Sequence, residues 1–222
     1  MPRPKATKVV GVLALQGAFK EHAELVETCV HEHGYPITVC EVKTREELER
    51  CDALIIPGGE STAISLIAQR CGLFEHLQKF VQDPAKAVWG TCAGLIFLAR
   101  EITSDEKLIR PLGVLHVAVQ RNAFGRQSHS FVAQCNFSSF MTPNKHTSKT
   151  GPFSTVFIRA PVIDRVLDPE KVQVLYEIDT PAGDNLVVAV RQSNILGTSF
   201  HPELADDHRF HDWFLRDFVI KE

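Results

Sequence analysis

A cysteine placed between two glycines gives the strongest chemical signal in the sequence. Residues 88–96 read Val-Trp-Gly-Thr-Cys-Ala-Gly-Leu-Ile, so an apolar run leads through Gly-x-Cys-x-Gly into a second apolar run. This is the strand–turn–helix pattern of a nucleophile elbow, with cysteine in place of serine. A turn this tight needs small flanking residues, and the start of the following helix favours a thiolate. Cys92 is therefore the candidate nucleophile, and the alternative interpretation is an ordinary buried cysteine.

A histidine far along the chain is the candidate base. His201 follows the apolar run 195–200 and stands in the segment His-Pro-Glu, so Glu203 lies two residues beyond it. A carboxylate in that place can orient the imidazole and stabilise its charged form, which completes a Cys–His–Glu triad. Taken alone, one of ten histidines could equally be a surface residue at the end of a strand. Together with Cys92, the triad is favoured.

Acyl chemistry also needs donors for the oxyanion, and two segments can supply them. The N–H of Ala93 directly follows the nucleophile, which is the usual place for one donor. Residues 57–62 read Pro-Gly-Gly-Glu-Ser-Thr between an apolar run and a helical pattern. A second donor is expected from Gly58 or Gly59 in this turn. The same turn can also be a simple helix cap with Ser61 as the N-cap residue, and the two interpretations are compatible.

Two weaker clusters contain side chains that could bind ligands. His208 and His211 are three residues apart. A metal site is conceivable there, but we interpret the pair as a solvated helix face and expect neither a metal ion nor a cofactor. Arg121, Arg126 and His129 form a short basic segment. This segment can hold a carboxylate or can be a solvated loop.

The first half of the chain alternates between two hydrophobic periods, and this predicts the elements that position Cys92. Apolar, valine-rich runs predict strands over residues 8–15, 37–42, 53–56 and 86–89. Helical patterns and a Thr44–Glu47 capping box predict helices over residues 19–33, 44–50, 61–71, 74–81 and 93–99. Strands that alternate with helices indicate a parallel sheet with helices on both faces.

The second half consists mainly of short strands, which we expect to extend the sheet in antiparallel fashion. They are predicted over residues 114–120, 130–137, 155–159, 172–178, 186–191 and 195–199, with a hairpin at 183–185, a polar loop at 138–151 and a last helix at 207–221. The prediction is one domain over residues 1–222 with a frayed tail at 1–7. Its fold class is a three-layer α/β/α, flavodoxin-like arrangement.

Composition excludes several functional classes. The chain has 222 residues, of which 44% are hydrophobic and 23% are charged, and its net charge is −3. It can bury a core, and it lacks the basic excess of a nucleic-acid binder. Its apolar runs are too short to cross a membrane, and the basic N-terminus shows no cleavage site. Six scattered cysteines without C-x-x-C indicate a reducing compartment, so we expect a cytoplasmic protein.

Several motifs resemble a known enzyme family. Gly-Thr-Cys-Ala-Gly at 90–94 with His-Pro-Glu at 201–203 resembles the class I, or triad, glutamine amidotransferases. Within that class, four further segments resemble the glutaminase subunits of the two-protein pyridoxal 5′-phosphate synthase. They are Leu-Gln-Gly-Ala-Phe at 15–19 with Glu-His at 21–22, Pro-Gly-Gly-Glu-Ser-Thr at 57–62, Gln-Arg-Asn-Ala-Phe-Gly-Arg-Gln at 120–127 and Phe-Ile-Arg-Ala-Pro at 157–161. The chain departs from the family in its longer polar stretch at 141–150.

The resemblance implies an activity and a role for each matched residue. Cys92 would be the nucleophile, His201 the base and Glu203 its orienting acid in hydrolysis of L-glutamine through a glutamyl thioester, without a cofactor. The residues implied to hold glutamine are Gly59, Glu60, Ser61, Arg121, Ile158 and Arg159. The Gln16–Gly17 segment would lie near the interface with the partner, a (β/α)₈-barrel synthase subunit that receives the ammonia. Low activity is expected of the isolated chain.

Three rival functions remain open. The first is a glutaminase that serves a different synthase, against which the segments at 57–62 and 121–127 speak. The second is a cysteine hydrolase similar to DJ-1, which would need neither His-Pro-Glu nor the arginines expected to hold glutamine. The third is a non-catalytic binding module, which is disfavoured because Cys92, His201 and Glu203 are all present.

Overall fold

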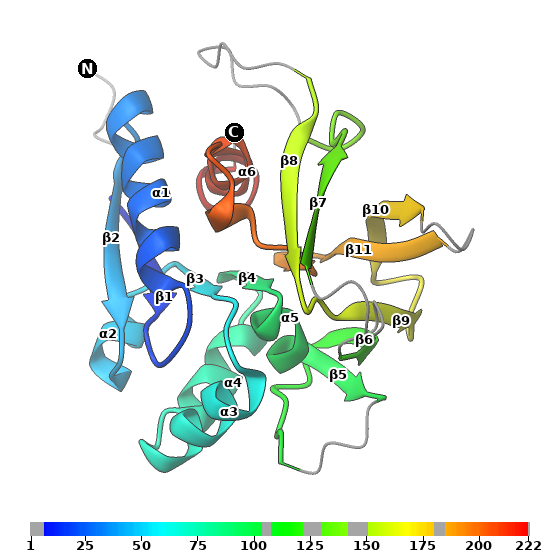
Figure 1. The fold of residues 1–222 in the computed structure, drawn as a ribbon. Coiled ribbons are helices and arrows are strands. Elements are labelled where there is room, and N and C mark those ends of the chain that lie inside the picture. The colour runs from blue at the N-terminus through cyan, green and yellow to red at the C-terminus, as the bar shows by residue number, and fades with distance from the viewer. Residues whose placement is uncertain (1–6, 104–107, 122–129, 142–150, 180–184, 222) are drawn as a thin grey trace.

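A large mixed sheet forms the centre of the molecule (Figure 1). The computed structural model describes residues 7–103, 108–121, 130–141, 151–179 and 185–221. Within them the main sheet has ten strands, and β7 (Ser130–Cys135) and β8 (Phe153–Ile158) form a separate antiparallel pair. The mixed α/β fold class predicted from the sequence is confirmed.

The parallel half of the sheet carries the first four strands and one late strand. In spatial order these are β2 (Ile37–Val42), β1 (Lys8–Leu13), β3 (Ala53–Ile56), β4 (Ala87–Thr91) and β12 (Ile195–Thr198). All four neighbouring pairs in this series are parallel. This is the flavodoxin-like strand order, in which ligands bind at the carboxyl ends of the strands. The late strand therefore brings the segment before His201 alongside the segment before Cys92.

The other half of the sheet is mainly antiparallel. From β12 outwards the order is β11 (Asn185–Gln192), β9 (Val162–Val166), β6 (Leu115–Gln120) and β5 (Ala99–Ile102), and β10 (Gln173–Asp179) also pairs with β11. The expected antiparallel additions are present, except that β5 and β6 are parallel to each other. The predicted hairpin connects β10 and β11, and its turn at 180–184 lies outside the described residues.

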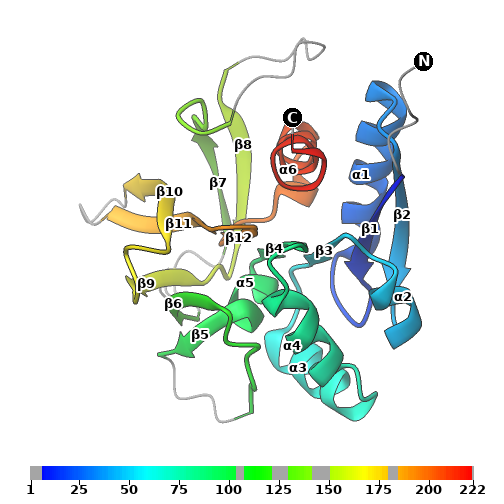
Figure 2. The same cartoon turned by 180° about the vertical axis from the view of Figure 1, so that it is seen from behind.

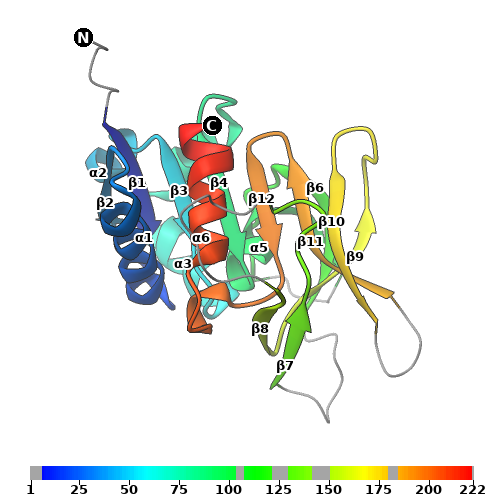
Figure 3. The same cartoon turned by 90° about the horizontal axis from the view of Figure 1, so that it is seen from above.

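Helices cover both faces of the parallel half (Figures 2 and 3). One face carries α1 (Phe19–His33) and α6 (Arg209–Phe214), which continues as a π-helical segment over Leu215–Ile220. The other face carries α3 (Ser61–Arg70), α4 (Phe74–Gln82) and α5 (Ala93–Leu98). Two short helices complete the fold, α2 (Arg45–Glu49) and a 3₁₀ turn at Pro202–Leu204.

The central strands are buried on both faces because their alternate residues enter two different cores. Ala53 and Ile55 of β3 belong to the core beneath α1 and α6. Leu54 and Ile56 belong to the core beneath α3, α4 and α5. All four have 0% exposure. A strand with this burial must read as a continuous apolar run, which is the pattern seen in the sequence.

Most predicted elements are present, with three informative differences. The first strand ends at Leu13 rather than at residue 15, and the helix predicted to reach 99 ends at Leu98, where β5 begins. Strand β9 was not predicted, since Asp164 and Arg165 interrupt its short apolar pattern.

The Thr44–Glu47 capping box is confirmed, with Glu47 N donating to Thr44 Oγ1 at 3.3 Å and Thr44 N to Glu47 Oε2 at 2.9 Å.

Two general expectations can be compared with the described residues. Among them, no helix combines the length and the apolarity that a membrane crossing requires. All six cysteines are free thiols. The expected tail at 1–7 and the polar loop at 138–151 fall largely outside the part of the chain that is described.

Candidate active site

Cys92 lies on a strained turn between β4 and α5. Its φ of 47° and ψ of −102° place a non-glycine residue at positive φ, which is uncommon and costs free energy. A hydrogen bond from Cys92 N to Thr198 O at 2.8 Å ties the turn to β12. A Cβ atom on Gly94 would lie 2.0 Å from the Ile56 carbonyl oxygen, so only glycine allows α5 to pack this closely on β3. The geometry is that of a nucleophile elbow.

His201 and Glu203 lie at the end of β12, beside the elbow. His201 Nδ1 is 2.7 Å from Glu203 Oε1, and His201 N donates to Val156 O of β8 at 2.8 Å. The two residues are only 8% and 6% exposed. The carboxylate therefore orients the imidazole, while the main-chain bond to β8 fixes the backbone that carries it.

The charges of this group stabilise one another. Burial by itself lowers the pKa of His201, but its hydrogen bonds to Cys92 and Glu203 outweigh burial and raise that pKa to about 10. Burial raises the pKa of Glu203, while the charge of His22 and the hydrogen bond from His201 lower it well below the usual range. Glu203 is therefore a carboxylate at neutral pH, and His201 carries a proton.

A second layer of buried polar side chains supports Glu203 from behind. His22 of α1 has its Nε2 at 3.3 Å from Glu203 Oε2 and at 3.2 Å from Thr91 Oγ1. Its Nδ1 is 2.9 Å from His211 Nε2. His22, Thr91 and His211 are all 0% exposed. The sequence analysis did not identify this group.

The position of His211 corrects the expectation of a solvated helix face. The helix α6 lies on the sheet between α1 and the β7–β8 pair (Figure 1), and the ring centroid of His211 is 5.0 Å from that of Trp89 on β4. Burial, followed by the charge of His22, lowers the pKa of His211 well below its usual value, so this ring is neutral. Asp212, the residue that follows His211, is buried as well, at 2% exposure. His208, in contrast, is only partly buried.

A cavity of about 330 Å³ opens in front of Cys92 and His201. Its lining combines residues from the ends of β4, β8 and β12 with the turn before α3. The lining residues are Gly59, Glu60, Ser61, Cys92, Ala93, Ile96, Arg121, Ile158, Arg159 and His201. All six residues expected to hold glutamine are in this set. Gly58 is not, but a Cβ atom there would lie 2.3 Å from His201 Cε1, so the turn packs directly against the imidazole.

The turn at 57–62 differs in one respect from the sequence interpretation. Glu60, rather than Ser61, is the N-cap of α3, since its carboxylate accepts from Thr62 N at 3.0 Å and Ala63 N at 2.6 Å. Burial raises the pKa of Glu60, but these backbone hydrogen bonds lower it below its usual value. Arg121 Nη2 lies 3.4 Å from Glu60 Oε1. The Ser61 hydroxyl is buried without a hydrogen-bond partner in the described part of the chain.

The Gln16–Gly17 segment lies against the same turn. Gln16 Oε1 accepts from Glu60 N at 2.7 Å, and Gly58 O accepts from Ala18 N at 3.0 Å. Gly17 has a φ of 98°, and a Cβ atom on it would lie 1.9 Å from Gly58 O. The loop after β1 is therefore in direct contact with the turn expected to form the oxyanion hole.

The structure thus brings Cys92, His201 and Glu203 close together. The six residues expected to bind glutamine line the cavity in front of Cys92 and His201. Arg126 and His129 lie outside the described residues. Sequence reasoning quoted His22, Thr91 and His211 in other contexts but did not predict that they lie together behind Glu203. A signal for His22 existed, because it lies four and seven residues before Val26 and Cys29 and shares their buried helix face.

Comparisons with known proteins identify relatives over nearly the whole chain. The model of the SNO glutamine amidotransferase family matches residues 12–220. Pyridoxal 5′-phosphate synthase subunit SNO1 of Saccharomyces cerevisiae is 55% identical over 97% of this chain and 95% of its own length. Subunit PdxT of Pyrococcus horikoshii is 45% identical over 95% of this chain and 99% of its own.

A solved structure also matches. It is described as a glutamine amidotransferase, has a TM-score of 0.75 and 42% sequence identity, and the match covers 93% of this chain and 97% of that one. Identities well above 30% over almost complete chains, together with the family match, agree with the strand order and with the elbow. On these grounds the chain belongs to the SNO glutamine amidotransferase family.

Proposed function

We propose that this chain hydrolyses L-glutamine to L-glutamate and ammonia with Cys92, His201 and Glu203. The observation that carries the proposal is that a cysteine on a strained elbow lines the same cavity as a histidine that is hydrogen-bonded to a carboxylate, although more than 100 residues separate the cysteine from the histidine. We also propose that residues 1–222 form a single domain and that the protein is cytoplasmic. We propose neither a nucleic-acid partner nor a membrane partner.

The first half of the reaction forms a covalent intermediate. Attack requires the pair in the form of thiolate and imidazolium, in which the proton of Cys92 resides on His201. The pKa of His201, raised to about 10, favours the imidazolium. The Cys92 sulfur attacks the side-chain amide carbon of glutamine, and the oxyanion accepts from the N–H groups of Ala93 and of the Gly58–Gly59 turn. His201 gives its proton to the nitrogen, the carbon–nitrogen bond breaks, and ammonia leaves a glutamyl thioester.

The second half releases glutamate. Water attacks the thioester carbon and loses its proton to His201, and the carbon–sulfur bond breaks to restore the Cys92 thiolate. Arg121 and Arg159 are the cations in the cavity lining, and a guanidinium suits the α-carboxylate of glutamine. Glu60 and the unpartnered Ser61 hydroxyl face the same space, with Gly59 and Ile158 completing the substrate site.

We assign His22 a positioning role. It touches neither the cavity nor the reacting atoms, but it bridges Glu203, Thr91 and His211. With one carboxylate oxygen near His22 and the other bonded to His201, Glu203 has one rotamer in which both contacts are made. The orientation of His201 then depends on a residue of α1.

The ammonia is proposed to pass to a synthase subunit that makes pyridoxal 5′-phosphate. The curated relatives carry that name, and one of them is 55% identical to this chain. The partner expected from the family resemblance is a (β/α)₈ barrel. Docking near Gln16 and Gly17 would act on the oxyanion turn directly, because these residues contact Gly58 and Glu60. This arrangement makes activation by the partner the expected behaviour.

The decisive experiment measures glutamate formation by the purified chain, alone and with a co-expressed pyridoxal 5′-phosphate synthase subunit. We expect little hydrolysis alone and a large increase in the complex. Cys92→Ala should abolish hydrolysis, with a loss of at least about 10³-fold, while partner binding and thermal unfolding stay unchanged. The matched control is Cys71→Ala, an exposed thiol, which should keep full activity.

Each rival function has its own outcome. Hydrolysis that the partner does not stimulate would favour a glutaminase for another synthase. Activity toward esters or other amides but not glutamine would favour a general cysteine hydrolase. Full glutamine turnover by Cys92→Ala would refute the assignment of the nucleophile.

A further inference from the structure

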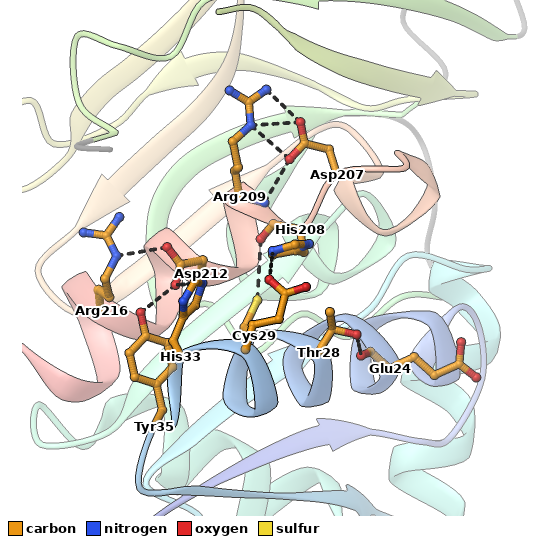
Figure 4. Close-up of polar contacts among 11 residues, drawn as sticks. Glu24, Thr28, Cys29, His33, Tyr35, Asp207, His208, Arg209, Asp212 and Arg216 are labelled. Atoms are coloured by element: carbon orange, nitrogen blue, oxygen red, sulfur yellow. Dashed lines mark hydrogen bonds and ion pairs between the residues drawn. The ribbon is translucent and has the colours of Figure 1, made fainter. Parts of the chain in front are cut away.

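A second group of side chains gathers where the end of α1 meets the start of α6 (Figure 4). Glu32 and His33 are the last two residues of α1, and His208 directly precedes α6. One ligand atom from each of the three lies within 4.8 Å of the other two. None of the three lines the cavity in front of Cys92. The group therefore needs an explanation of its own.

His33 provides the strongest observation. Its side chain is 6% exposed, yet neither ring nitrogen has a hydrogen-bond partner in the described part of the chain. The carboxylate beside it, Asp212, has its Oδ1 3.5 Å from His33 Nε2, and that oxygen already accepts from the Tyr35 hydroxyl at 2.6 Å. Burial of a polar ring without a hydrogen bond costs free energy of folding, so a ligand bound to the His33 ring would stabilise the fold.

The other two residues keep the group accessible. Glu32 Oε2 is 2.9 Å from His208 Nε2, and their side chains are 47% and 24% exposed. Zinc ligands at bond lengths of about 2.0–2.2 Å lie roughly 3–3.5 Å apart in a tetrahedron. The ligand atoms here lie as much as 4.8 Å apart, so the exposed Glu32 and the partly exposed His208 would adjust their side-chain torsions on binding the ion.

We propose that Glu32, His33 and His208 bind a divalent transition metal ion, for which Zn²⁺ is the best match. Two imidazole nitrogens and one carboxylate oxygen are a donor set that zinc accepts, with water in the fourth position. Asp212 stands beside His33, where a carboxylate commonly orients a ligating imidazole. The ion joins α1 to α6, two elements at opposite ends of the sequence. This inference does not depend on glutaminase activity.

Zinc titration of the chain tests the proposal directly. The measurement uses the Cys92→Ala variant, because a reactive thiolate in the active site can itself bind zinc. After treatment with a chelator, calorimetric titration with ZnCl₂ should give one ion per chain. Zinc at about 100 times its Kd should raise the Tm by at least about 5 °C.

Substitutions in that background locate the site. His33→Asn and His208→Asn should each weaken zinc binding by at least about 100-fold and remove the Tm increase. The matched control is His31→Asn, which removes an exposed histidine from the same helix and should change nothing. If His33→Asn does not fold, Glu32→Gln at an exposed position gives the same test. No saturable zinc binding in the parent, or unchanged affinity in His208→Asn and Glu32→Gln, would overturn the proposal.

Discussion

The two oxygens of Glu203 face two different histidines, and this makes the carboxylate the centre of the buried polar network. Oε1 is 2.7 Å from His201, and Oε2 is 3.3 Å from His22. A carboxylate with 6% exposure needs such partners, because an unpaired buried charge is strongly destabilising. The orientation of His201, the proposed base, thus depends on Glu203 and, through Glu203, on His22.

Removal of His22 should slow turnover without weakening glutamine binding. We expect His22→Ala to lower kcat by about 10–100-fold, because Glu203 loses its second contact, while KM changes by less than about twofold. His22→Gln, whose amide can donate to the carboxylate from nearly the same place, should recover most of the rate. Steady-state glutaminase assays in the synthase complex measure both constants. Equal losses in the two variants would contradict the proposal that donation from residue 22 to Glu203 sets the rate.

The raised pKa of His201 makes stability depend on pH. The ordinary pKa is 6.5, and in the fold it is about 10. Since the folded state binds the proton more tightly, the contribution of His201 to the free energy of unfolding is complete below pH 6.5 and is lost as the pH rises to about 10. The difference in stability between wild type and His201→Gln should therefore shrink over this range. Urea unfolding at the two ends tests this, and a difference that grows with pH would contradict it.

At the scale of elements, the elbow depends on the close approach of α5 to β3. Gly94→Ala places a methyl group 2.0 Å from the Ile56 carbonyl oxygen, so the helix must shift. We expect a loss of about 3 kcal/mol in the free energy of unfolding and at least a 100-fold loss of turnover. Thermal unfolding and glutaminase assays provide the two measurements.

The control for this variant is a glycine with space around it. Gly72→Ala, where φ is 74° and no atom lies within 4 Å of the new Cβ, should cost only about 1 kcal/mol of backbone strain and leave turnover intact. Similar losses in both variants would mean that the close approach of α5 is not what restricts position 94.

How far the sequence predicts an element depends on its burial. The strands ending at Ile56 and Thr91 are predictable because burial on both faces leaves a continuous apolar run. Strand β9 is not, because two of its five residues are exposed and charged, and its strand state depends on pairing with β6. In the same way, the spacing of His208 and His211 suggests a surface pair, and only the packing of α6 on the sheet beside α1 shows that His211 is buried.

The predictability of the candidate site follows the same logic. Cys92, His201 and the turn at 57–62 carry local patterns of glycine, proline and charge, so sequence alone singles them out. The place of His22 behind Glu203 depends on contacts with Glu203 and Thr91, which are distant in the chain. Such contacts leave no mark on local spacing.

At the scale of the whole molecule, an aromatic cluster holds α6 on the sheet. Phe210 is 0% exposed and lies with ring centroids 5.4 Å from Trp89 and 5.3 Å from Phe200. Phe210→Ala should lower the free energy of unfolding by about 4 kcal/mol, since it leaves a cavity between α6 and β4. The control Leu204→Ala, at a position 44% exposed, should change it by no more than about 0.5 kcal/mol. Denaturant titration distinguishes the two, and equal effects would argue against a tightly packed cluster.

The place of β12 in the sheet has a consequence for the order in which activity can arise. This strand follows β4 by about 100 residues in the sequence, yet it lies between β4 and β11, and Cys92 N bonds to its Thr198. A growing polypeptide that has not yet reached β12 has the elbow sequence, but it lacks both the strand beside the elbow and the imidazole of His201. Chains that stop before β12 are thus inactive, and no glutamine is consumed until that strand and His201 are in place.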